Sequence, residues 1–144
     1  MRKLGLVLLC IAAACGGAAM NSDGSPAGAV GPREAVEQFL ATVRSKDIQK
    51  MSLIWGTSSG PVRDRMERNE MEKREILLQC YLKHDAFKVL DDNRSDDGKV
   101  KFRVELTQSG QKKTTTFVAV KGPGDRWFME DADITVMQDF CTGR

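Results

Sequence analysis

The stretch 99-KVKFRVEL-106 decides the second half of the fold. Charged and apolar residues alternate at every position, so an extended backbone turns one set of side chains toward a core and the other toward water. The apolar set is Val100, Phe102, Val104 and Leu106. This pattern predicts a half-buried strand in an antiparallel sheet that has one covered face.

Strand signals continue on both sides of this stretch. Phe87 and Val89 indicate a strand before it, and the Asp-Asp-Gly sequence at 96–98 is typical of a turn between the two. After it, residues 114–121 and 126–134 are rich in residues that favour strands, with Gly-rich turns ahead of each. The order predicts an antiparallel meander of about four or more strands.

Helical spacing dominates the chain ahead of this meander. Residues 32–45 repeat apolar residues every three or four positions, and residues 47–55 form a shorter helix that Asp47 caps. A third helix is expected from about residue 62 to residue 82. Its charged part, residues 63–75, places opposite charges four apart, which we interpret as a solvated face rather than a binding surface. The fold class expected is therefore α+β, with three N-terminal helices packed on the sheet.

This order resembles the nuclear-transport-factor-two-like family. The resemblance rests on AVEQFL at 35–40, Lys46-Asp47, Leu53-Ile54-Trp55 and RWFMEDA at 126–132, and it extends from residue 32 to about residue 134. It implies a cone-like fold, in which the helices pack into a strongly curved antiparallel sheet and often enclose a pocket. The superfamily includes isomerases, dehydratases and cyclases as well as many members without catalysis, so the fold does not decide the function.

The N-terminus has the features of an export signal. Arg2 and Lys3 precede eleven uncharged, mainly apolar residues, 4–14, which span roughly 16 Å as a helix and are too short to cross a bilayer. The run AAACG at 12–16 resembles the lipobox of bacterial lipoproteins, and the resemblance implies cleavage before Cys15 and lipidation of its sulfur. The alternative is ordinary secretion, with cleavage near Ala14 or Ala19 and a free Cys15.

Three segments follow from this interpretation: a signal peptide at 1–14, a lipidated Cys15 with a flexible Gly-rich tether at 15–31, and an α+β domain at 32–144. Acyl chains such as palmitate would hold the protein in the cell envelope. Gly16 after the cysteine resembles enterobacterial sorting to the periplasmic face of the outer membrane. The membrane is thus the first expected partner.

Composition limits the classes of partner expected besides the membrane. The chain of 144 residues carries 22 Lys+Arg and 20 Asp+Glu, and the excess of two positive charges equals Arg2 and Lys3. The remainder is balanced and lacks the basic surface that nucleic-acid binding favours. Phosphate-binding glycine motifs are also absent from the sequence, and no cofactor is expected.

Two cysteines remain once Cys10 is cleaved off and Cys15 is lipidated. Cys80 ends the third expected helix and Cys141 lies near the C-terminus. In an oxidising compartment an even number favours a disulfide, and two buried free thiols are the alternative. A zinc site is less favoured, because one histidine and two cysteines show no ligand spacing.

Few residues suggest catalysis. His84 and Asp85 are interpreted as a solvated turn pair, although they could act as a base and its partner, and Tyr81 is interpreted as packing. The acidic residues Asp91, Asp92, Asp96 and Asp97 miss the calcium-loop spacing and fit a hairpin turn better.

Two functional hypotheses follow. The first is a non-enzymatic envelope lipoprotein that binds a small apolar ligand or another envelope protein. The second is a small-molecule isomerase or lyase that uses a cone pocket, with His84, Asp85 or Tyr81 as acid-base groups. The direction in which these three side chains point distinguishes them.

Overall fold

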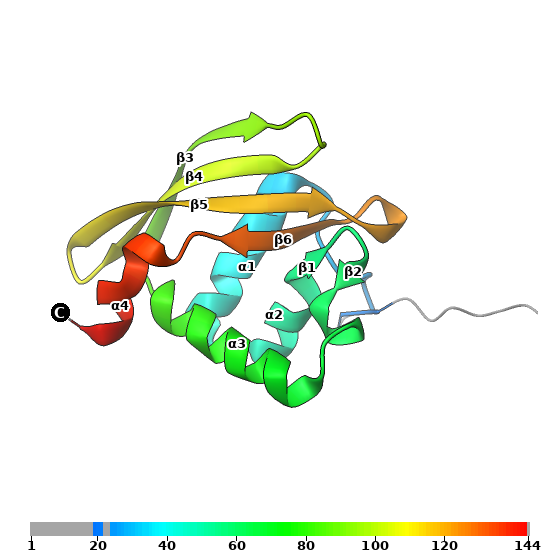
Figure 1. Ribbon diagram of the computed structural model, residues 1–144, viewed down its shortest axis with the longest axis horizontal. Coiled ribbons are helices and arrows are strands. Elements are labelled where there is room, and N and C mark those ends of the chain that lie inside the picture. The colour runs from blue at the N-terminus through cyan, green and yellow to red at the C-terminus, as the bar shows by residue number, and fades with distance from the viewer. Residues whose placement is uncertain (1–18, 22–23, 144) are drawn as a thin grey trace, which may run out of the picture.

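The computed structural model describes residues 19–21 and 24–143 of the chain. The predictions for the signal segment at 1–14 and for Cys15 lie outside these residues. The described part is an α+β fold that contains four α-helices, a four-stranded antiparallel sheet and a two-stranded sheet (Figure 1). The helices are α1 (Pro32–Ser45), α2 (Ile48–Ile54), α3 (Arg68–Tyr81) and α4 (Gln138–Thr142), and the strands are β1 (Gly56–Thr57), β2 (Gly60–Pro61), β3 (Ala86–Arg94), β4 (Val100–Gln108), β5 (Gln111–Lys121) and β6 (Trp127–Ala132).

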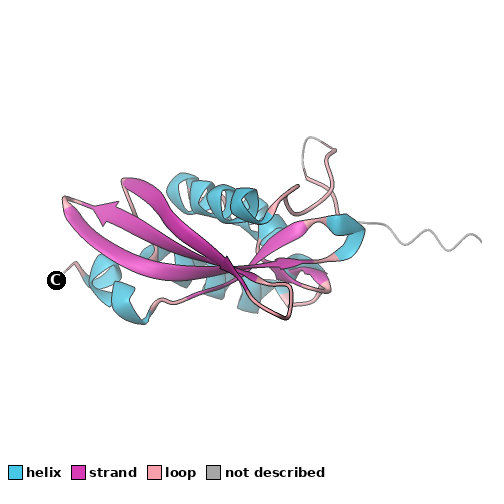
Figure 2. Ribbon diagram, turned by 90° about the horizontal axis from the view of Figure 1, so that it is seen from above, coloured by secondary structure: helices cyan, strands magenta, loops and turns pink. Residues whose placement is uncertain are grey.

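The large sheet is the meander that the alternating stretch predicts. Its strands follow the order β3-β4-β5-β6, and every neighbouring pair is antiparallel. The apolar residues of β4 are buried, and Phe102 lies opposite Phe117 of β5. Figure 2 shows the twist of the sheet and α1 along one side of it. The covered face of the sheet therefore forms one wall of the core.

The first two helices form where the sequence predicts them. Pro32 is the first residue of α1, and the buried residues of this helix face β5 and β6. Lys46 ends the helix in a left-handed conformation, and the Asp47 side chain accepts a hydrogen bond from the Lys50 amide to begin α2. These caps turn the chain sharply, so α2 packs back against α1.

The expectation of three N-terminal helices was wrong. The described residues contain four α-helices, and the fourth, α4, follows the sheet instead of preceding it. The region 56–61 forms the two-stranded sheet β1-β2. Short elements of this kind leave little periodicity in a sequence, because tertiary contacts rather than propensity stabilise them.

The third helix also begins later than expected. Residues Val62–Asp64 form one 3₁₀ turn, and the Glu67 side chain then accepts the amide hydrogens of Asn69 and Glu70, which starts α3 at Arg68. Of the charge pairs expected four apart, Arg68–Glu72 and Glu70–Arg74 form, at 2.8 and 2.7 Å. Both pairs are solvent-exposed, which confirms the solvated character of this face.

The structure differs from the expected tether at its C-terminal end. Residues 26–30, called the strap below, cross the end of the sheet beside β6, and Ala27 and Ala29 are buried. Ala29 and Trp127 exchange both backbone hydrogen bonds at 2.8 Å, and the Gly28 amide donates to the Leu53 carbonyl at 3.0 Å. The packed part of the chain thus begins before Pro32.

Candidate functional site

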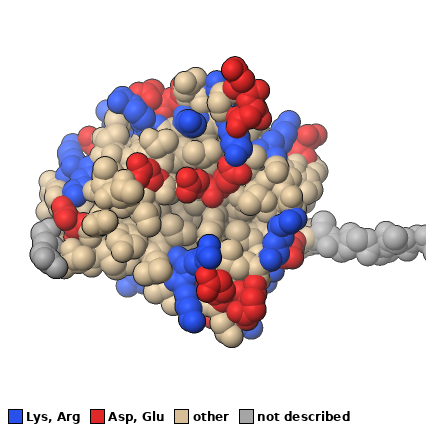
Figure 3. Space-filling view, viewed as in Figure 1, with Lys and Arg blue, Asp and Glu red and all other residues tan. Residues whose placement is uncertain are grey.

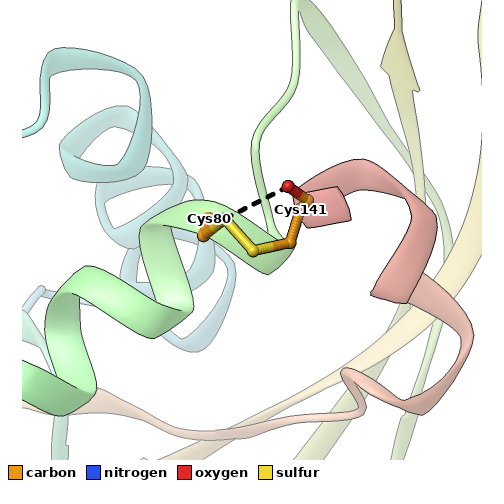
Figure 4. The surroundings of a disulfide bond; sticks show 2 residues. All are labelled: Cys80 and Cys141. Atoms are coloured by element: carbon orange, nitrogen blue, oxygen red, sulfur yellow. Dashed lines mark hydrogen bonds between the residues drawn. A yellow bond between two sulfur atoms is a disulfide. The ribbon is translucent and has the colours of Figure 1, made fainter. Parts of the chain in front are cut away.

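A disulfide joins the helical layer to the C-terminal helix. The sulfurs of Cys80 and Cys141 are at bonding distance, with the two Cα atoms 4.8 Å apart, which confirms the expected pairing (Figure 4). Cys80 lies at the C-terminal end of α3, and Cys141 lies in α4. The buried residues Met137 and Phe140 hold the same segment against the core. The bridge therefore fixes the position of α4 beside the end of α3.

An open groove of about 600 Å³ lies beside this bridge. One wall comes from the C-terminal end of α1, and the other comes from α3 and the segment that follows it. Its volume falls within the range of small-molecule sites in proteins. The residues that line it include Arg44, Lys46, Ile76, Gln79, Lys83, His84, Asp85 and Gln108.

Three cationic side chains line the groove without carboxylate partners. Arg44 and Lys46 come from the end of α1, and Lys83 follows α3; all three are exposed. None of the ion pairs within residues 24–143 includes any of them. Asp85 is the single acidic residue of the lining. The groove therefore has an excess of positive charge, although the described chain elsewhere mixes the two signs, as the face in Figure 3 shows.

Unsatisfied polar atoms gather at the same place. Five side-chain polar atoms of the described residues are buried without a hydrogen-bond partner. Three of these, Gln79 Nε2, His84 Nε2 and Gln108 Oε1, belong to residues that line the groove. A buried polar atom without a partner costs free energy, so such atoms are few in folded proteins and need an explanation. Three of the five such atoms in the described residues therefore belong to residues around one groove.

The candidate acid-base residues do not form a catalytic set. His84 is only 6% exposed, so its interpretation as part of a solvated pair was wrong. Its Nδ1 lies 2.8 Å from the Leu82 carbonyl, whereas the Asp85 carboxylate accepts the Ser109 amide hydrogen at 2.7 Å. Tyr81 packs against the core cluster and is not a lining residue of the groove. The two adjacent side chains thus bind different backbone groups, as adjacent residues commonly do.

The surroundings of His84 disfavour its charged form. Burial lowers the pKa of the imidazole below its ordinary value, and the hydrogen bond to the Leu82 carbonyl opposes this only in part. With the Nδ1–H donating to that carbonyl, Nε2 carries a lone pair and acts as an acceptor. Two residues that line the groove therefore hold a buried acceptor nitrogen, His84 Nε2, and a buried amide donor, Gln79 Nε2.

Glu75 contributes the other two unpartnered atoms. The side chain is fully buried on the inner face of α3, and neither carboxylate oxygen has a hydrogen-bond partner. Burial, with a smaller contribution from Glu72, raises the pKa of Glu75 to about 7, and Arg63 lowers it slightly. Glu75 is not a lining residue of the groove, but it lies one helical turn before Gln79.

Two acidic residues of the β3-β4 hairpin, Asp91 and Asp97, have internal partners. Asp91 binds the Arg103 guanidinium at 2.6 Å, and Asp97 accepts hydrogen bonds from the Ser95 hydroxyl and the Lys99 amide. Within the described part of the chain, no three His, Cys, Asp or Glu side chains are grouped so that they could hold a metal ion. None of the helices described there is long and apolar enough to cross a membrane.

Sequence reasoning missed most of the groove. One usable signal was Gln79, which interrupts the apolar run at 76–82. Glu75 is also unusual, since it falls on the helical stripe of Met71, Leu78 and Leu82, but it lies outside the groove lining. No local pattern indicates that the end of α1 and Gln108 of β4 lie beside them, because that proximity arises only from the packing of helices on the sheet.

The comparisons with known proteins give no family. No family model matches the chain, and no curated protein matches it. The resemblances to the lipobox and to the nuclear-transport-factor-two-like family therefore stay predictions from the sequence.

Proposed function

We propose that this protein is an exported, non-enzymatic lipoprotein that binds a small anionic ligand in the groove between α1 and α3. One observation carries the binding role: three cations outside the described ion pairs, and three residues that each hold a buried polar atom without a partner, line the same groove. A ligand that has a carboxylate or phosphate and further hydrogen-bonding groups would satisfy both sets at once. These charges favour an anionic ligand over the apolar one expected from a closed cone pocket.

The anchor is a separate part of the proposal. The lipobox-like run at 12–16 supports lipidation of Cys15, and attachment to the cell envelope would follow, on the periplasmic face of the outer membrane. Another envelope protein that presents an acidic segment would satisfy the same groove chemistry. The isomerase or lyase alternative gains no support, because His84 and Asp85 are bound to separate backbone groups and Tyr81 packs in the core.

The binding role is tested by amide NMR titration of residues 19–144 with citrate, inorganic phosphate and a short acidic peptide. We expect shifts confined to the groove for at least one of these probes. The double variant Lys46→Ala/Lys83→Ala should weaken the binding at least tenfold. The matched control is Lys88→Ala/Lys101→Ala, which removes two exposed lysines outside the groove and should leave it unchanged. Equal losses in both variants, or no localised shift, would contradict the proposal.

The anchor is tested by intact-mass analysis of protein purified from a bacterial membrane fraction, with a Cys15→Ser variant for comparison. Acyl mass on an N-terminal Cys15 is expected. A mature chain without it would refute the lipoprotein part and leave the groove proposal standing.

A further inference from the structure

The strap is attached to the domain at several independent points. Besides its backbone bonds to Trp127 and Leu53, the Arg126 guanidinium donates to the carbonyls of Pro26, Ala27 and Gly28 at 3.4, 3.3 and 2.7 Å. Gly28 has φ +80°, and a Cβ there would lie 2.9 Å from both Phe128 Cζ and the Trp127 carbonyl oxygen. The strap therefore has one close-fitting position at this end of the sheet.

The attachment extends back to Ala19. The Ala27 amide donates to the Ala19 carbonyl at 2.9 Å, and Met20 forms a β-bridge with Pro26. The Asn21 side chain donates to the Pro26 carbonyl at 2.8 Å. Four residue steps separate Ala19 from Cys15, and a fully extended chain covers at most about 14 Å in that distance. A lipid on Cys15 would therefore hold this end of the domain within that reach of the bilayer.

The strap end carries some exposed apolar surface. A hollow of about 360 Å³ lies between the strap, the β1-β2 turn and the Pro123 loop, and its apolar lining consists of Ala19, Pro26, Ala27, Pro61, Pro123 and Phe128. Met20 and Val30 are 54% and 73% exposed. Burial of this apolar surface against lipid would be favourable.

The groove lies at the other end of the molecule. In Figure 1 the described chain begins beside β1, β2 and the loop before β6, whereas the end of α3, α4 and the β4-β5 turn lie at the opposite end. β5 runs from that turn to Lys121 beside the strap, a length of about 33 Å.

From these observations we propose that the strap end of the domain rests on the lipid surface that holds Cys15, so that the anionic-ligand groove faces away from the membrane. This inference rests on the lipid anchor of the proposed function. The protein then contacts the membrane twice, through the acyl chains on Cys15 and through the strap end. With both contacts made, the domain has a fixed orientation and does not rotate on a free tether. The groove then remains open to ligands at a distance from the anionic headgroups, which would otherwise compete for its cations.

The orientation is tested with fluorescent probes on the lipidated protein in phosphatidylcholine vesicles that carry a headgroup quencher. Ser59→Cys places a thiol in the β1-β2 turn, and Gln111→Cys places one at the far end of β5; both positions are exposed. No other free thiol interferes, because Cys15 is acylated and Cys80 is bound to Cys141. We expect quenching at Ser59→Cys to be several-fold greater than at Gln111→Cys.

A lengthened tether is the matched control. Ten Gly/Ser residues inserted between Gly16 and Gly17 leave the strap and its contacts intact but remove the constraint on reach. The insertion should lower the quenching of the Ser59→Cys probe toward that of the Gln111→Cys probe. Equal quenching of both probes in the acylated, vesicle-bound parent protein would overturn the orientation but not the anchor. A chain without acyl mass that fails to bind vesicles would overturn both.

Discussion

The two ends of the molecule satisfy their polar groups in opposite ways. At the strap end, Arg126 donates to three successive carbonyls, and the strap amides of Ala27, Gly28 and Ala29 all have backbone partners. At the groove end, three cations lack carboxylate partners and three buried polar atoms lack hydrogen bonds. Unsatisfied groups reduce stability and persist where function needs them. The contrast therefore separates the end that holds the chain in place from the end that we propose to bind a ligand.

Removal of the disulfide should have the largest effect on this contrast. The double variant Cys80→Ala/Cys141→Ala opens a loop with a sequence separation of 61 residues. On the chain-entropy account it should lose about 4 kcal/mol of unfolding free energy. Denaturant unfolding measures the loss, and hydrogen exchange should locate the loosening in α4 and the end of α3, with the strap amides still protected. Equal loosening at both ends would show that the two regions are not independent.

Replacement of Glu75 should give the next largest effect, a change in how the free energy of unfolding depends on pH. The pKa of Glu75 in the folded protein is about 7, above the ordinary value of 4.5. The folded protein therefore binds this proton more tightly than the unfolded chain, which stabilises the fold. The stabilisation is complete below pH 4.5 and is lost as the pH rises through 7. The span between the two values corresponds to about 3 kcal/mol of unfolding free energy. The Glu75→Gln variant should lose this pH dependence, as measured by urea unfolding between pH 4.5 and pH 8. An unchanged slope in the variant would contradict the assignment.

At the strap end, Gly28→Ala tests how closely the chain fits. A methyl group at this position would contact Phe128 and the Trp127 carbonyl at 2.9 Å with φ at +80°. We expect a loss of about 2 kcal/mol of unfolding free energy and faster hydrogen exchange at Ala27 and Ala29. Gly98→Ala is the matched control, since Gly98 also has positive φ but no atom within 4 Å of an added Cβ. If both variants lose the same amount, backbone strain alone explains the effect and the close fit contributes nothing.

The smallest expected effect is an increase in stability, on replacement of Gln79. Gln79→Met replaces a side chain whose buried amide nitrogen has no partner, so the variant should gain about 1 kcal/mol of unfolding free energy while it loses anion binding. Thermal unfolding and the NMR titration measure the two changes. A variant that is destabilised and still binds would show that Gln79 serves the fold rather than the ligand.

Much of the secondary structure was predictable from local patterns. The alternation at 99–106 identified β4, the helical spacing at 32–45 identified α1, and Asp47 identified the start of α2. The late start of α3 was not predictable from charge spacing, because Glu67 continues the alternating charges of the run at 63–75 although its side chain caps the helix. α4 was missed because five residues with few apolar positions carry no usable period.

The sequence by itself determined the α+β class and the meander and favoured the pairing of Cys80 with Cys141, since alternation, helical spacing and the number of cysteines are local or countable properties. Only the tertiary structure decided that residues 26–30 belong to the domain and that Arg44, Lys83 and Gln108 line one groove. The physical reason is the same in both cases. Proximity between residues that are distant in the chain depends on how the helices pack on the sheet, and no periodicity within either segment encodes it.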